Sequence, residues 1–153
     1  MLKFILSICI IATSFSAHSQ EALRTKHYNV NSKSVAVSGY DVVAYFTLNK
    51  AVKGDKNYAV NAEGVFYYFS SRENKELFLR NWRNYEPQYG GWCAYAMGSY
   101  GSKVEIDPQT FKIVNGKLYL FYHSWTNNTL TKWNRDEDHL RNRANVNWTN
   151  IFR

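Results

Sequence analysis

One cysteine and one histidine are the clearest candidates for chemistry in this chain of 153 residues. Cys93 and His123 together offer a thiolate and an imidazole, which suit copper(I), or zinc with further ligands. Met97 lies four positions after Cys93 and would add a thioether if that segment is helical. Asp41 would supply an oxygen or orient the imidazole. We therefore predict a metal site for copper or zinc at Cys93, His123 and Met97.

Each of these residues also has a structural interpretation. Cys93 would be a small buried hydrophobic residue, and Met97 would fill a gap in the core. Asp41 would cap a helix, and His123 would be a hydrogen-bonded residue at the end of a strand. No local pair has the spacing of a Cys-x-x-Cys or His-x-x-x-His metal motif.

Aromatic residues are abundant, with 12 Tyr, 9 Phe and 5 Trp. One interpretation is a pocket for a small molecule or a peptide, in which aromatic rings surround a few polar groups. The predicted lining residues are Tyr40, Asp41, Tyr45, Trp92, Tyr95 and Tyr122. The alternative is that the tyrosines build the core and direct their hydroxyl groups to polar partners.

A third hypothesis makes Cys93 a nucleophile with His123 as its base. No recognised nucleophile motif surrounds Cys93, and an exposed reactive thiol would oxidise outside the cell. We therefore expect a binding protein without enzymatic activity.

The first residues have the pattern of a secretory signal peptide. Lys3 gives a positive start, residues 4–12 form a short apolar run, and Ala17-His18-Ser19 offers a small-x-small cleavage site. We expect cleavage after residue 19 and a secreted or periplasmic mature protein. A lipoprotein anchor at Cys9 is the alternative, which bulky Ile8 disfavours.

The formal net charge is +7, but basic and acidic residues alternate along the chain. This pattern is typical of solvated helix faces rather than of a nucleic-acid-binding patch. No segment after the signal is long and apolar enough to be a transmembrane helix. We therefore expect a metal ion or small-molecule ligand as the partner, no nucleic acid and no transmembrane segment.

The remaining pattern predicts an α+β domain with two short antiparallel hairpins that form a small sheet packed with several short helices. Residues 20–34 have no periodicity and are predicted to be an extended leader, and residues 35–153 are predicted to be the domain. Gly64 and Asn115-Gly116 mark the two hairpin turns, because they tolerate positive φ. Ser70 and Glu73 match a capping box that starts a helix reaching about Trp82.

Two further helices are predicted after the second hairpin, over residues 124–133 and 136–147. Leu140, Ala144 and Trp148 would mark the inner face of the last one. Residues 64–71 and 116–123 also resemble each other, which indicates a faint internal repeat in which His123 corresponds to Ser71.

Three motifs stand out together: Tyr122-His123-Ser124, the run that begins Gly39-Tyr40-Asp41, and the run around Gly91-Trp92-Cys93. They resemble motifs of the YHS domain family, in its secreted single-domain branch. They occur in the expected order, and the resemblance spans roughly residues 35–148.

The resemblance implies a compact α+β domain of a family often associated with handling heavy metals, copper especially. In cysteine-rich members of the family, a Cys-x-x-x-Cys pattern enters the helix after the first hairpin. Here those positions correspond to Ser70 and Asn74, which supply no thiolate. The metal site of those cysteine-rich members is therefore absent from this chain, and the resemblance does not imply that it inherits their zinc or copper binding.

Overall fold

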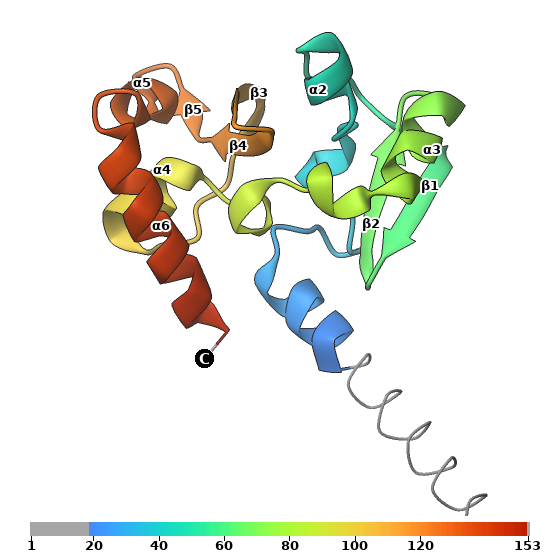
Figure 1. The fold of residues 1–153 in the computed structure, drawn as a ribbon, viewed down its shortest axis with the longest axis horizontal. Coiled ribbons are helices and arrows are strands. Elements are labelled where there is room, and N and C mark those ends of the chain that lie inside the picture. Colours follow the sequence, from blue (N-terminus) through green and yellow to red (C-terminus); the bar gives the residue numbers. More distant parts are fainter. Residues whose placement is uncertain (1–18, 153) are drawn as a thin grey trace, which may run out of the picture.

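The computed structural model describes residues 19–152, and two antiparallel hairpins organise this part of the chain (Figure 1). β1 (Asp55–Ala62) pairs with β2 (Val65–Phe69), and β3 (Asp107–Val114) pairs with β4 (Lys117–Phe121). The α+β class is confirmed. The two hairpins nevertheless form separate two-stranded sheets instead of the one small sheet expected.

Both hairpin turns depend on residues with positive φ. Glu63 and Gly64 have φ values of 50° and 86°, and Asn115 and Gly116 have values of 51° and 69°. Two consecutive residues of this kind form the turn that matches the right-handed twist of the strands. The turn positions predicted from sequence are confirmed.

The first hairpin carries two helices, α2 (Ala44–Leu48) before it and α3 (Arg72–Arg80) after it. The cap of α3 was predicted one residue too early. Ser71 is the N-cap and accepts a hydrogen bond from the amide of Asn74, whereas the Ser70 hydroxyl donates to the buried carboxylate of Asp41. A 3₁₀ turn over Trp82–Asn84 follows α3, so the α-helix ends before Trp82.

The second hairpin lies between α4 (Ala94–Tyr100) and two later helices. A short ribbon of β5 (His123–Ser124) and β6 (Asn127–Asn128) replaces the start of the predicted helix, and α5 covers only Thr129–Trp133. The last helix, α6 (Glu137–Ile151), packs closely on α4. A Cβ atom at Gly98 would lie 2.5 Å from the carbonyl oxygen of Leu140, so only glycine fits there.

The internal repeat is much more extensive than the sequence indicates, because positions 52 residues apart make the same pairings. Asp55 pairs with Phe69 and Asp107 pairs with Phe121, and in each hairpin a register shift follows directly. A parallel bridge joins Val35 to Phe66 in one half and Pro87 to Leu118 in the other. The described chain is therefore built from two equivalent halves.

The entry loops of the two halves also correspond. A 3₁₀ turn spans Val37–Gly39 in the first half, and another spans Gln88–Gly91 in the second. In each loop a hydrogen bond closes the same turn, from Tyr40 N to Val37 O (3.0 Å) and from Trp92 N to Tyr89 O (3.2 Å). The residues that follow these turns are Asp41 and Cys93, which therefore occupy equivalent positions.

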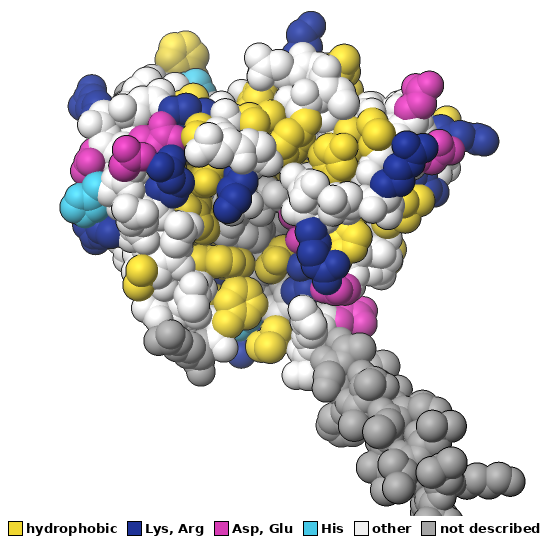
Figure 2. All heavy atoms as spheres, in the orientation of Figure 1, with side chains coloured by type: hydrophobic (Ala, Val, Ile, Leu, Met, Phe, Trp, Pro, Cys, Tyr) yellow, Lys and Arg dark blue, Asp and Glu magenta, His cyan; other side chains and the backbone are white. Residues whose placement is uncertain are grey.

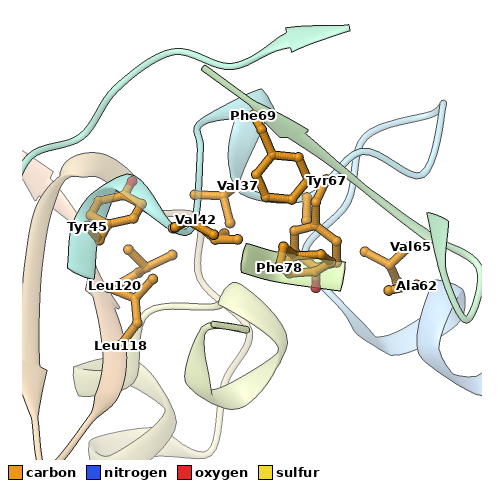
Figure 3. Close-up of a cluster of buried hydrophobic side chains, with 12 residues drawn as sticks. Val37, Val42, Tyr45, Ala62, Val65, Tyr67, Phe69, Phe78, Leu118 and Leu120 are labelled. Carbon is orange, nitrogen blue, oxygen red and sulfur yellow. The ribbon is translucent and has the colours of Figure 1, made fainter. Parts of the chain in front are cut away.

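The hydrophobic core joins the halves. One cluster contains the inner residues of the first hairpin and α3 together with Leu118 and Leu120 from β4 of the second half, which lie next to Tyr45 (Figure 3). A second cluster surrounds Trp133 and includes Leu140, Ala144 and Trp148, as the helix pattern predicts. Because one core crosses the boundary, the two halves form a single domain.

The segment predicted to be an extended leader is helical over residues 19–27. Arg24 anchors this helix, because its side chain is nearly buried and donates to Glu86 (Nη2 to Oε1, 2.5 Å) and to the carbonyl oxygen of Ala62 (3.3 Å). A buried arginine paired in this way fixes the helix over residues 19–27 to the rest of the domain. Nothing in the local sequence pattern indicates this pairing.

Among residues 19–152, no helix combines the length and the apolar character needed to cross a membrane. The predicted signal peptide, apart from its last residue, lies outside the described residues.

Candidate functional site

Cys93 lies at the point where the second entry loop becomes α4. Its backbone N–H donates to Val104 O (3.0 Å), and its side chain has no solvent contact. The sulfur lies 3.3 Å from the amide nitrogen of Tyr122 and 3.4 Å from the hydroxyl oxygen of Thr129. The thiol thus ties the start of α4 to the end of β4 and the start of α5.

The hydroxyl group of Thr129 shows which way these hydrogen bonds run. It donates to the carbonyl oxygen of Tyr122 at 2.7 Å, and a hydroxyl group has a single proton to give. The Cys93 S–H must therefore donate to Thr129 Oγ1, while its sulfur accepts the Tyr122 N–H. In this state the thiol is satisfied by protein groups alone.

His123 follows Tyr122 directly, but its ring points elsewhere. The imidazole is about half exposed, with 44% of the side-chain surface accessible, and its Nδ1 lies 3.4 Å from Asp107 Oδ2. Asp107 also accepts a hydrogen bond from the Thr110 hydroxyl group (2.9 Å). The carboxylate that orients His123 is thus Asp107, and the prediction that Asp41 does so is wrong.

Met97 is buried one helical turn after Cys93, and its amide donates to the Cys93 carbonyl oxygen (3.0 Å). Its side chain belongs to the cluster around Phe121 and Trp133, so it fills the core as the structural interpretation predicts. Within residues 19–152, no three His, Cys, Asp or Glu side chains gather in a way that could hold an ion. Cys93, His123 and Met97 lie on segments that contact one another, but their side chains do not form an assembled set of metal ligands.

Asp41 is the centre of a buried hydrogen-bond network. Its Oδ1 accepts from the amides of Val43 (2.9 Å) and Ala44 (3.2 Å), which caps the turn leading into α2. Its Oδ2 accepts from the Ser70 amide (2.8 Å), the Ser70 hydroxyl group (2.7 Å) and the Asn74 side-chain amide (2.7 Å). Five donors satisfy this carboxylate, so it has a structural role and no free oxygen for a metal or for His123.

The six residues predicted to line an aromatic pocket do not enclose a shared cavity. Tyr45 and Asp41 have no solvent contact, and the Tyr45 hydroxyl group donates to Pro108 O (2.8 Å) inside the core. Trp92 donates from its indole nitrogen to His27 O (2.7 Å). The pocket hypothesis is therefore wrong for Tyr45 and Asp41, because both side chains are fully buried and their polar atoms are bonded to other parts of the protein.

The other three predicted lining residues lie near the surface but apart from one another. Tyr40 lies under the ammonium group of Lys53, which is 4.5 Å from the ring centroid. Tyr95 packs edge-on against Tyr100, and Tyr122 contributes its backbone to the Cys93 contacts.

Two residues of this neighbourhood escaped the sequence analysis, Thr129 and Asp107. Thr129 carries no motif that would identify it. Asp107 could have been found by extending the repeat backwards, because Asp55 begins the first hairpin at the equivalent position. Each of these aspartates accepts a hydrogen bond from the amide two residues later.

No family model, no curated protein and no solved structure matches this chain.

Proposed function

We propose that the chain is an exported, YHS-type binding protein that holds a soft metal ion, copper(I) in preference to zinc, between Cys93 and His123. The observation that carries the proposal is the 3.3 Å contact between the Cys93 sulfur and the Tyr122 amide. This contact brings the Cys93 thiol next to the backbone of Tyr122, the residue before His123, although Cys93 and Tyr122 are 29 positions apart in sequence. Sulfur and imidazole nitrogen are the ligands that copper(I) accepts in low coordination numbers.

Metal binding would require two local changes. The Cys93 thiol has to release its proton to solvent, which ends its donation to Thr129. The His123 ring has to turn away from Asp107, and because the ring is half exposed this costs one partly solvated contact worth about 1 kcal/mol or less. Zinc would need further ligands, and Asp107 is the nearest carboxylate to His123.

A binding role fits the burial of Cys93 better than a catalytic one does. A nucleophilic thiol has to meet its substrate, and the Cys93 side chain has no exposed surface. A thiol-reactive probe tests this directly. We expect no labelling of the native protein at neutral pH and rapid labelling after denaturation; rapid native labelling would favour an enzyme.

The metal proposal is tested by anaerobic titration of the purified protein with copper(I) in competition with a chromophoric chelator, and separately with zinc. We expect one equivalent of copper(I) to be taken up, and this uptake to be lost in Cys93→Ala and weakened at least about ten-fold in His123→Ala. The matched control is His139→Ala, because His139 is also exposed and also lies near an aspartate, with Nδ1 3.7 Å from Asp136 Oδ2. Equal uptake by all of these variants would mean surface binding and would refute the site.

A further inference from the structure

A groove runs along the seam between the two halves, away from Cys93. It consists of two adjoining hollows with volumes of about 390 Å³ and 500 Å³, and Arg83, Gln88 and Lys117 line both. The space-filling view shows a hollow between the halves, with Lys and Arg side chains on both sides of it and hydrophobic side chains beside it (Figure 2). Volumes in this range fit a small organic molecule.

The charge of the groove is positive. Arg83 is exposed and pairs with Glu63 (Nη2 to Oε1, 2.7 Å), which lies beyond the groove lining, and Lys117 is exposed at the start of β4, directly after the turn. Glu86 is the carboxylate that lines the groove within the described part of the chain. Its Oε1 accepts hydrogen bonds from Arg24 (2.5 Å) and from the Tyr67 hydroxyl group (2.6 Å), so Arg24, which does not line the groove, balances its charge. Lys117 and Arg83 therefore both bring cationic groups to the groove, and the charge of Arg83 is shared with Glu63.

The wall next to these cations is aromatic and electrically neutral. Tyr28, Tyr89 and Trp148 line one hollow, and the rings of Tyr28 and Trp148 pack at 5.8 Å between centroids. Burial, and then the charge of Glu86, raise the pKa of Tyr28 to about 12, and burial also raises the pKa of Tyr89. Both phenols keep their protons at neutral pH, so they add no negative charge that would repel an anion.

Side-chain amides complete the groove. Asn145 Oδ1 accepts a hydrogen bond from the Tyr89 hydroxyl group (3.0 Å), so the Asn145 NH₂ group remains available as a donor. Gln88 lines both hollows and contributes a second amide. Donors beside cations favour an acidic oxygen-rich group, and a neighbouring aromatic wall favours a ring.

We propose that this groove binds a small organic anion in which a carboxylate or a phosphate is attached to a ring. The acidic group lies beside Arg83 and Lys117, and the ring lies against Tyr89 and Trp148. This site shares no residue with the Cys93 neighbourhood, so the proposal does not depend on whether the protein binds a metal.

The test uses benzoate, phenyl phosphate, inorganic phosphate and the neutral benzyl alcohol as probes. Each is titrated into the purified protein while NMR follows the Trp148 indole N–H and the side-chain amides of Gln88 and Asn145. We expect one or both ring-bearing anions to shift these signals in a saturable way, and comparison of benzoate with phenyl phosphate identifies the preferred acid. Inorganic phosphate should bind more weakly, because it lacks the ring.

Charge variants decide whether the groove is responsible. We expect Lys117→Ala and Arg83→Gln each to weaken binding about five-fold, as the loss of a partly exposed ionic contact predicts, and Lys117→Glu to weaken it more. Lys50→Ala and Arg80→Gln remove exposed cations that do not line either hollow and should leave binding unchanged. The proposal is overturned if no anion shifts the groove signals at millimolar concentration, if benzyl alcohol binds as well as the anions, or if the control variants weaken binding equally.

Discussion

The two halves of this domain share a backbone design and differ in the group at its centre. In the first half, the Ser70 amide donates to Asp41 Oδ2; in the second, the equivalent Tyr122 amide donates to Cys93 Sγ. In both halves the residue after the entry loop is thus fastened to the end of the second strand of a hairpin. Both halves make this contact, through a carboxylate in one and a thiol in the other.

The number of partners separates the two positions further. Asp41 receives five hydrogen bonds, including one from the Asn74 side chain on α3. Cys93 has two partners, and the residue that faces it from α5 is Thr129. A saturated carboxylate can only stabilise, whereas a thiol with two weak hydrogen bonds can exchange them for a metal ion at modest cost. The comparison therefore supports the proposed function, in which Cys93 of the second half is the reactive group and its counterpart Asp41 has a structural role.

Loss of the Asp41 carboxylate should have the largest effect. Asp41→Ala leaves buried donors of Ser70 and Asn74 without an acceptor, and we expect the free energy of unfolding to fall by about 3 to 5 kcal/mol. Denaturant titration measures it. Asp55→Ala is the control, because Asp55 is exposed and accepts one local amide; a loss of similar size there would show that the buried network is not the cause.

Exchange of the central groups tests the equivalence itself. Cys93→Asp places a carboxylate where only two donors are available, and we expect a loss of about 2 to 3 kcal/mol from its incomplete hydrogen bonding. Adding Thr129→Asn supplies an amide donor like that of Asn74 and should recover at least about 1 kcal/mol in a double-mutant cycle. If the two substitutions prove additive, the positions are not equivalent in the way the structure indicates.

Local signals in the sequence predicted much of the fold, but they could not predict contacts between residues that are far apart in the chain. Both hairpin turns follow from Gly64 and Asn115-Gly116, whose conformational freedom depends only on neighbouring residues. The helix cap was misplaced because Ser70 is held by Asp41, 29 positions earlier. The helix at residues 19–27 was missed because Arg24 is anchored by Glu86, 62 positions later.

The candidate site shows the same difference between local signals and distant contacts. The residue types of Cys93 and His123 were evident from sequence, but the partners that define their state, Thr129 and Asp107, come from other strands and helices. In the sequence, the repeat was visible only in the aromatic strands. The entry loops of the two halves share their backbone conformation but not their side chains: Val37 and Tyr89 are equivalent, and both have positive φ.

A high pH should also distinguish the halves, through the equivalent tyrosines Tyr67 and Tyr119. Burial and then Glu86 raise the pKa of Tyr67 well above its usual 10, while the pKa of Tyr119 is raised by burial to a smaller extent. A phenol with a raised pKa in the folded state contributes its full stability below pH 10 and loses it as the pH rises towards the folded pKa. For Tyr67 the loss is about 1.4 kcal/mol per pH unit.

The measurement is denaturant unfolding at several pH values between 9 and 11, for the wild type and for Tyr67→Phe and Tyr119→Phe. Tyr67→Phe should flatten the decline over the whole range above pH 10, and Tyr119→Phe should flatten it over a narrower range just above pH 10. An equal effect of the two variants would contradict the difference in burial between the halves.

Cys93→Ser should have the smallest effect on stability and therefore gives the sharpest separation of structure from function. A serine hydroxyl group can accept the Tyr122 amide and donate to Thr129, as the thiol does, so we expect the free energy of unfolding to change by no more than about 1 kcal/mol. Oxygen is a poor ligand for copper(I), so uptake should nevertheless be lost. A stable variant that has lost copper(I) binding would show that sulfur serves chemistry at a position where the fold needs only a hydrogen-bonding group. A variant that still binds would instead make Cys93 the plain structural counterpart of Asp41.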